Sequence, residues 1–94
     1  MTLLLKDPEG VLDYAIDWGA EYLPAGDLLS QSDWSVIPDE PDGVAIVGSD
    51  FDATIATVKA GGGVPGKIYK LVNQVVTESG RVDDRSIVLR VEKR

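Results

Sequence analysis

The chain has 94 residues, 44% of them hydrophobic, a formal net charge of −7, and neither cysteine nor histidine. This predicts one small globular domain whose acidic surface disfavours binding to nucleic acid or anionic membranes. Without thiols or imidazoles, the chain cannot form disulfides, ordinary zinc sites, or serine–histidine or cysteine–histidine catalytic pairs.

The N-terminal segment carries only three consecutive leucines, Leu3 to Leu5, before a charged residue. A secretory signal needs an apolar region of about 7–15 residues, and a membrane span needs about 18. We therefore expect a protein made in the cytoplasm, which leaves it only as part of an assembly.

The first half of the chain predicts two strands separated by turns. A Lys-Asp-Pro-Glu-Gly turn at residues 6–10 precedes residues 11–18, where apolar and polar side chains alternate with a period of two. This period predicts a strand with one face in water. Residues 19–27, which contain a proline and two glycines, predict a loop with at most one short turn. A second strand is predicted over residues 28–37, where Trp34 and Val36 share one face of an alternating pattern. The proline that follows ends this strand.

The middle of the chain predicts short strands with frequent breaks. In order, we expect an acidic turn at 39–43, a strand at 44–47, a break at 48–50, a strand at 51–59 and a flexible glycine-rich connection at 61–66.

The last third, residues 67–91, predicts a β-hairpin. Two alternating apolar runs flank the turn sequence Glu-Ser-Gly-Arg at residues 78–81. Both faces of the first run carry apolar residues: Tyr69, Leu71 and Val75 on one, and Ile68, Val72 and Val76 on the other. A strand of this kind is either central in a sheet or covered on its second face by a partner subunit.

These elements together predict an all-β fold. About six or seven short strands punctuated by turns are typical of an immunoglobulin-like antiparallel β-sandwich. We expect a single domain over residues 1–94 with a short N-terminal arm, residues 1–10.

Several residue clusters are candidate functional sites. The glycines at 61–66 lack the helix start that a phosphate loop needs, so a bent connection is favoured. The acidic loops, with Asp39, Glu40 and Asp42 in one and Asp50 and Asp52 in the next, could bind calcium, but a solvated acidic rim is favoured. Asp13 and Asp17, about 13 Å apart along a strand, are too far apart for glycoside hydrolysis.

The candidate partner-binding residues lie mostly in the hairpin. Alternating charges at its turn and second strand can fix the strand register or contact another protein. Two tryptophans are present, of which Trp34 suits a core position and Trp18, at a strand end, suits either a core or an exposed anchor. The candidates are Trp18, Arg81, Asp83, Asp84 and Arg85.

The order of several segments resembles a family of small proteins of tailed bacteriophages. The matching segments are Lys6-Asp7-Pro8-Glu9-Gly10, Leu12-Asp13-Tyr14, Asp17-Trp18, Ser32-Asp33-Trp34, Gly61-Gly62-Gly63, the strand with Tyr69, Asn73 and Thr77, and Gly80-Arg81-Val82-Asp83-Asp84-Arg85-Ser86. The resemblance implies an immunoglobulin-like fibre–tail adaptor or a similar virion component. It also implies partners among tail, fibre, connector or major capsid subunits, and several copies in the assembled particle.

The leading hypothesis is therefore a non-enzymatic structural adaptor in a phage virion, made in the host cytoplasm and without cofactor or metal. A capsid cement or decoration protein is the alternative within the same class. An independent calcium- or glycan-binding module is the alternative from another class.

Overall fold

Most of the chain forms β-strands. The computed structural model describes residues 3–21 and 23–93. In order, the elements are β1 (Leu3–Lys6), β2 (Leu12–Asp17), α1 (Trp18–Glu21), β3 (Leu29–Ile37), β4 (Val44–Phe51), β5 (Ile55–Gly62), β6 (Ile68–Thr77) and β7 (Val82–Val91). No helix in these two ranges has the length and apolar character that would let it cross a membrane.

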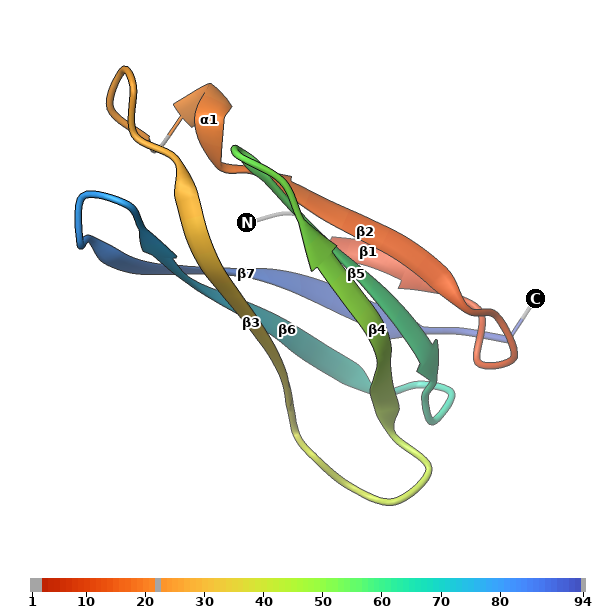
Figure 1. Ribbon diagram of the computed structural model, residues 1–94. Coiled ribbons are helices and arrows are strands. Elements are labelled where there is room, and N and C mark those ends of the chain that lie inside the picture. The colour runs from red at the N-terminus through yellow and green to blue at the C-terminus, as the bar shows by residue number, and fades with distance from the viewer. Residues whose placement is uncertain (1–2, 22, 94) are drawn as a thin grey trace.

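The strands form two sheets that pack face to face (Figure 1). One has the order β1-β7-β6-β3 and the other the order β2-β5-β4. In an immunoglobulin-type sandwich, the first, second, fifth and fourth strands form one sheet, and the third, sixth and seventh form the other, so this chain differs in that β1 lies beside β7. The predicted all-β, immunoglobulin-like sandwich is thus confirmed.

The first strand departs from a purely antiparallel arrangement. β1 lies parallel to the end of β7, in the register Leu3↔Val88 to Lys6↔Val91. The predicted N-terminal arm therefore contains, within its described residues, a strand of the four-stranded sheet.

The C-terminal hairpin has the predicted position. β6 and β7 pair antiparallel from Ile68↔Arg90 to Val76↔Val82. The turn between them closes with a 2.9 Å hydrogen bond from the amide of Thr77 to the carbonyl of Arg81. Gly80 has φ 91°, a conformation that glycine adopts without steric cost.

The boundaries of β4 and β5 differ from prediction. β4 does not break at residues 48–50, because an irregularity between Ile46 and Gly48 lets the ladder with β5 continue to Phe51. β5 begins at Ile55 rather than at residue 51, since Asp52 Oδ1 accepts the amides of Thr54 and Ile55 and so forms the hairpin turn. The glycine-rich stretch is also more ordered than predicted, because its first two residues belong to β5.

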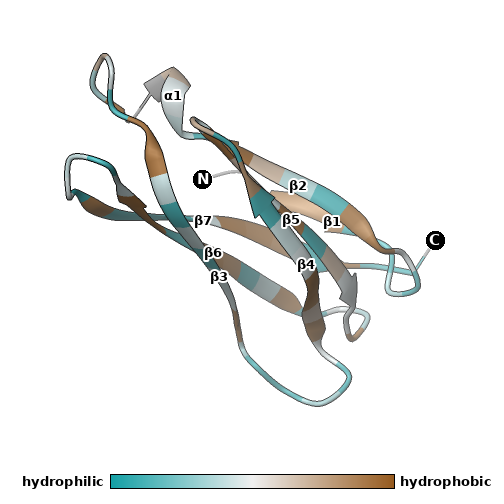
Figure 2. Ribbon diagram, viewed as in Figure 1, coloured by the Kyte–Doolittle hydropathy of each residue, from teal (hydrophilic) through white to brown (hydrophobic). Residues whose placement is uncertain are grey.

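The core lies between the sheets in two adjacent clusters. One contains Val58, Tyr69, Leu71 and Leu89, and the other contains Ile16, Trp18, Leu29, Ala56 and Val75. Trp34 packs against both clusters. Hydrophobic and hydrophilic residues alternate along several strands in Figure 2, as expected where one strand face is buried.

Candidate interaction surface

The four-stranded sheet has an exposed apolar region on the face that points away from the core. Side chains alternate along β6, so that Tyr69 and Leu71 are buried while Ile68 is 56% exposed. The register places six apolar residues together on this outer face, and we call them the apolar outer face: Leu3, Leu5, Ile37, Ile68, Val72 and Val88.

These residues occupy three neighbouring rows across the sheet. Leu3 lies beside Val88, Val88 beside Lys70, and Lys70 beside Ile37. In the next row Leu5 lies beside Arg90, which lies beside Ile68. Leu3 and Ile37, at opposite edges of the sheet, are 52% and 56% exposed. A group of exposed apolar residues in adjoining rows, interleaved here with Lys70 and Arg90, is typical of a protein–protein contact, whereas single exposed apolar residues are not.

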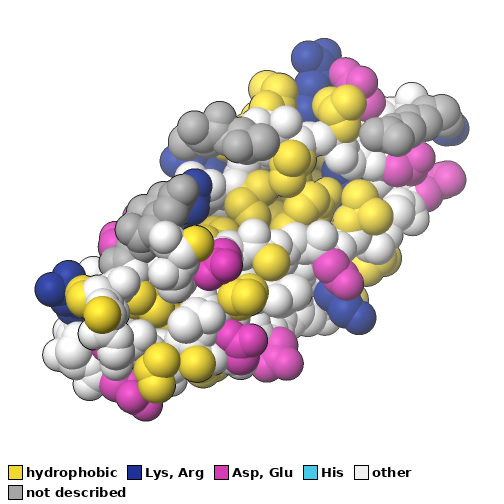
Figure 3. Space-filling view, turned by 90° about the horizontal axis from the view of Figure 1, so that it is seen from above, with side chains coloured by type: hydrophobic (Ala, Val, Ile, Leu, Met, Phe, Trp, Pro, Cys, Tyr) yellow, Lys and Arg dark blue, Asp and Glu magenta, His cyan; other side chains and the backbone are white. Residues whose placement is uncertain are grey.

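The charges on this face are unevenly distributed. Lys70 and Arg90 lie among the apolar residues, and Arg90 pairs with Glu92 at 2.9 Å. Further along the strands, the row of Asp33, Gln74 and Asp84 is polar. The apolar outer face is therefore local to the end of the sheet where β1 lies. Figure 3, a view of the molecule from above Figure 1, shows hydrophobic side chains gathered near the middle of one face, with acidic and basic side chains among and around them.

The outer face of the three-stranded sheet has a different character. Its residues include Asp13, Asp17 and Asp50, all exposed, together with Lys59 and Thr57. Small and charged side chains predominate here, and two exposed valines, Val11 and Val47, lie beside Gly61, so this face has fewer exposed apolar groups than the apolar outer face.

Trp18 is a core residue and not an exposed anchor. Its side chain is 0% exposed, and its Nε1 donates a 2.8 Å hydrogen bond to Oδ1 of Asn73. Asn73 is also fully buried and donates to Ser32 Oγ and to the carbonyl of Asp33. Of the two positions that the sequence leaves open for Trp18, the structure shows the core position, because the start of α1 turns the indole into the gap between the sheets.

The other four candidates, Arg81, Asp83, Asp84 and Arg85, are exposed at the start of β7. A hollow of about 240 Å³ brings two of them close to Trp18. Its lining residues are Trp18, Leu23, Val75, Thr77, Arg81, Val82 and Asp83. The lining residues come from α1, the segment after it, β6 and the start of β7, and Figure 1 shows α1 and the β6–β7 turn at the same end of the molecule. Three of the five predicted residues therefore share one site.

Lys6 has a structural role that its sequence position does not reveal. Its side chain is 0% exposed, and its Nζ donates to the carbonyls of Asp7, Gly10 and Gly62 at 2.8, 2.7 and 2.7 Å. Burial lowers the pKa of Lys6, and the nearby Asp7 carboxylate partly opposes that shift. The lysine thus fixes the β1–β2 turn against the end of β5, which holds β1 in place.

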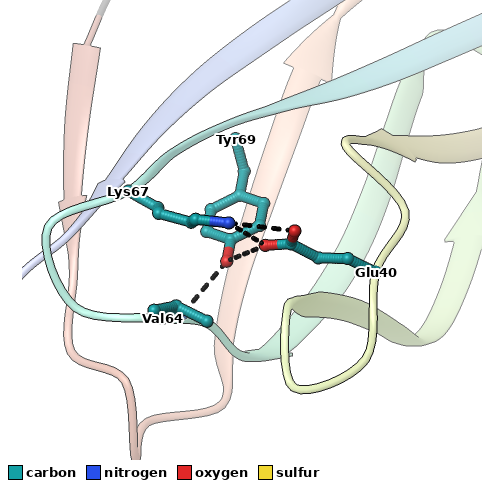
Figure 4. A network of polar contacts seen from close by, with 4 residues as sticks. All are labelled: Glu40, Val64, Lys67 and Tyr69. Carbon is teal, nitrogen blue, oxygen red and sulfur yellow. Dashed lines mark hydrogen bonds and ion pairs between the residues drawn. The ribbon is translucent and has the colours of Figure 1, made fainter.

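A second polar network fixes the opposite loop (Figure 4). Glu40 accepts hydrogen bonds from Lys67 Nζ at 2.9 and 3.0 Å and from the Tyr69 hydroxyl at 3.1 Å. The Tyr69 hydroxyl also accepts the amide of Val64 at 3.0 Å. A tyrosine near the start of the sixth strand that bonds the backbone a few residues upstream is a feature of immunoglobulin-type sandwiches.

This network bears on the calcium-binding alternative. The hydrogen bonds from Lys67 and Tyr69 lower the pKa of the Glu40 carboxyl, and backbone amides do the same for Asp52. Both carboxylates are thus engaged by the protein itself. Within the described ranges, no group of three or more acidic side chains is close enough to hold a metal ion.

Fold and surface together define a class of protein: a small immunoglobulin-like module with an exposed apolar sheet face suited to binding other proteins. Over residues 6–90 the sequence matches the family model described as podophage GP4 fiber-tail adaptor protein gp77, and the chain belongs to this family. No curated protein matches the chain. The resemblance to fibre–tail adaptors is thus confirmed, and the chain is a structural adaptor of a phage virion that binds other virion proteins.

Proposed function

We propose that the chain is a non-enzymatic adaptor that bridges two subunits of the tail, fibre or connector, and that it docks on one of them through the apolar outer face. The supporting observation is the set of half-exposed apolar side chains in adjacent rows of one sheet face. Complete burial of a leucine or isoleucine contributes about 1.5–3 kcal/mol, so a half-exposed one gains about 1 kcal/mol when a partner covers it. Four such groups, Leu3, Leu5, Ile37 and Ile68, supply a useful part of a stable interface, and the less exposed Val72 and Val88 add less.

A bridge also needs a second contact, and the opposite end of the same sheet provides one. The charged residues Arg81, Asp83, Asp84 and Arg85 lie near the β6–β7 turn, whereas the apolar outer face lies beside β1. The molecule is 42 Å long in its greatest dimension, so partners at the two ends need not collide. In this proposal Lys70 and Arg90, within the apolar outer face, favour a first partner with an acidic rim.

We also propose that each particle contains several copies of the chain, since an adaptor that joins symmetric assemblies is present once for each symmetry-related position. The proposal also includes synthesis in the host cytoplasm before assembly. A capsid cement protein would use the same apolar outer face and would differ in its partner, so attachment experiments separate the two functions.

The test uses tail-containing particles assembled without this protein. The purified chain is added back, and the bound fraction is measured by sedimentation. Ile68→Lys places a charge in the apolar outer face, and we expect it to weaken attachment about tenfold or more. The matched control is Val47→Lys, which places the same charge at an exposed valine of the other sheet and should attach like the native chain.

Equal attachment of Ile68→Lys and the native chain would refute docking through this face. Attachment to tailless capsids, with none to isolated tails, would instead identify a cement protein.

A further inference from the structure

One side of β7 in the four-stranded sheet is only partly covered by the described part of β1. β7 pairs with β6 over Val82–Arg90, but among the described residues β1 pairs only with Val88–Val91. The segment Val82–Ile87 therefore has one paired edge and one edge along which no described strand lies.

The printed hydrogen bonds show which backbone groups point outward along this edge. The amide of Val91 donates to Lys67 O, and Thr77 N donates to Arg81 O, so odd-numbered residues of this strand face β6. Antiparallel ladders alternate, and the even-numbered residues therefore direct their amides and carbonyls to the other side. Glu92 N donates to Lys6 O of β1, in agreement with this alternation. Val82, Asp84 and Ser86 thus present their backbone groups to the side of β7 along which no strand of residues 3–21 or 23–93 lies.

The side chain of Asp83 protects this edge from pairing with another strand in the free protein. Its Oδ1 accepts the amide of Asp84 at 2.8 Å, which satisfies one outward donor in the free protein. Charged side chains on an edge strand are a common protection against uncontrolled pairing. Because Asp83 is exposed, its side chain can rotate away when a strand approaches.

The 240 Å³ hollow lies next to the same edge, since Val82 and Asp83 are among its lining residues. Its apolar walls come from Leu23 and Val75, above the buried Trp18. An apolar cavity of about 150 Å³ accommodates a benzene molecule, so this hollow has room for a leucine or phenylalanine side chain. A strand placed along the edge would direct alternate side chains to the core side of the sheet, where the hollow is.

We propose that the uncovered edge of β7, residues Val82–Ser86, receives an extended segment of a partner virion protein as an added β-strand, with one bulky apolar side chain of that segment seated in the hollow. This inference rests on the proposed adaptor function and specifies its second contact. Backbone bonds would supply affinity and the hollow would supply specificity, as in other cases of strand addition.

Charge indicates a different protein as the occupant rather than a second copy. Each copy has a net charge of −7, so two copies repel each other as they approach, and the edge segment, where Arg81 and Arg85 flank Asp83 and Asp84, has no net charge that would offset this repulsion. A partner segment with lysine or arginine beside its apolar anchor would complement these aspartates.

The test isolates a single backbone donor. Asp84→Pro removes the outward amide but no bond to β6, because proline is tolerated where the strand N–H faces outward. Asp84→Ala is the matched control, since it removes the same carboxylate and keeps the amide. Both are added to particles that lack the protein, with melting temperatures recorded to confirm folding. We expect Asp84→Pro to attach about tenfold more weakly than Asp84→Ala.

Hydrogen–deuterium exchange of the native chain provides a second readout. On attachment, the amides of Val82, Asp84 and Ser86 should exchange about tenfold or more slowly, while those of Asp83 and Arg85 are already protected by β6. Unchanged exchange at the three outward amides, or equal attachment of the two variants, would overturn strand addition while the adaptor function stood. Failure of the native chain to attach would overturn both. Concentration-dependent dimers of the isolated chain, with the same amides protected, would show a second copy as the occupant and overturn the choice of partner.

Discussion

Trp18 and Asn73 are joined by a 2.8 Å hydrogen bond from the indole Nε1 to the amide Oδ1, and both side chains are fully buried. Asn73 also donates to Ser32 Oγ at 2.9 Å and to the carbonyl of Asp33 at 3.1 Å. One buried amide therefore connects α1, β6 and β3. A buried polar group is costly when it loses its partners, so this pair holds the end of the sandwich that contains the hollow.

Replacement of the amide should destabilise the fold strongly. Asn73→Leu leaves the Trp18 indole without this acceptor and the Asp33 carbonyl without this donor, at a cost of about 2–4 kcal/mol. The measurement is the free energy of unfolding in urea. Trp18→Phe and the double variant complete a thermodynamic cycle, and we expect a coupling of about 1 kcal/mol or more between the two sites. Additive effects would show that the bond contributes little.

Lys6 should contribute to stability through hydrogen bonds and not through surface charge. Lys6→Met keeps the aliphatic chain but leaves three carbonyls without their donor, and we expect a loss of about 3 kcal/mol. Lys59→Met, at an exposed lysine of β5, is the matched control and should unfold like the native chain. If the two variants unfolded at the same urea concentration, the buried lysine would not be an anchor.

Two glycines in the connection between β5 and β6, Gly63 and Gly66, are required for different reasons. Both have positive φ, 118° and 86°, but a Cβ at Gly63 would lie 2.6 Å from Val91 Cγ2, whereas one at Gly66 would meet nothing within 4 Å. Gly66→Ala should therefore cost about 1–2 kcal/mol from its backbone conformation alone. Gly63→Ala should cost about 1–3 kcal/mol more, because it also overpacks the core. Equal melting temperatures of the two variants would contradict this packing argument.

The C-terminal hairpin could be predicted from the sequence because its signals are local. Alternation in β6 and the Glu-Ser-Gly-Arg turn identify strands, turn and faces without knowledge of the rest of the chain. The same alternation indicates a second apolar face. The contribution of Leu3 and Leu5 to that face could not be predicted, because it depends on the parallel pairing of β1 with a strand more than eighty residues later.

The errors in the sequence-based prediction have the same origin. Gly48-Ser49-Asp50 resembles a strand break, yet the neighbouring strand keeps β4 paired across an irregularity. The sequence allows either an exposed or a buried position for Trp18. The fold decides between them, because it places Asn73 beside the indole. Lys6 has no sequence signal of burial, because its acceptors are backbone carbonyls that the fold assembles from three separate positions. Local patterns thus identify strands, and the long-range contacts determine which polar residues are structural.

The Glu40–Lys67 ion pair should make stability depend on pH at both extremes. Hydrogen bonds from Lys67 and Tyr69 hold the pKa of Glu40 below its ordinary value of 4.5, and the bond to Glu40 raises the pKa of Lys67 above 10.5. A lowered carboxyl pKa contributes stability that is present above the unfolded-state pKa and is lost as pH falls through the folded-state pKa. The raised lysine pKa contributes stability that is complete below 10.5 and is lost as pH rises through the folded-state pKa.

Glu40→Gln tests both limits. At neutral pH the variant should melt at a lower temperature than the native chain, because the glutamine cannot attract Lys67 as a carboxylate does. The difference should shrink as pH falls from 4.5 through the lowered pKa of the native Glu40, and again as pH rises from 10.5 through the raised pKa of the native Lys67. Glu78→Gln, at an exposed position in the β6–β7 turn, controls for the change in net charge. A difference in melting temperature that stayed constant from acid to alkaline pH would mean that the pair fixes the β3–β4 loop by shape alone, without an electrostatic contribution.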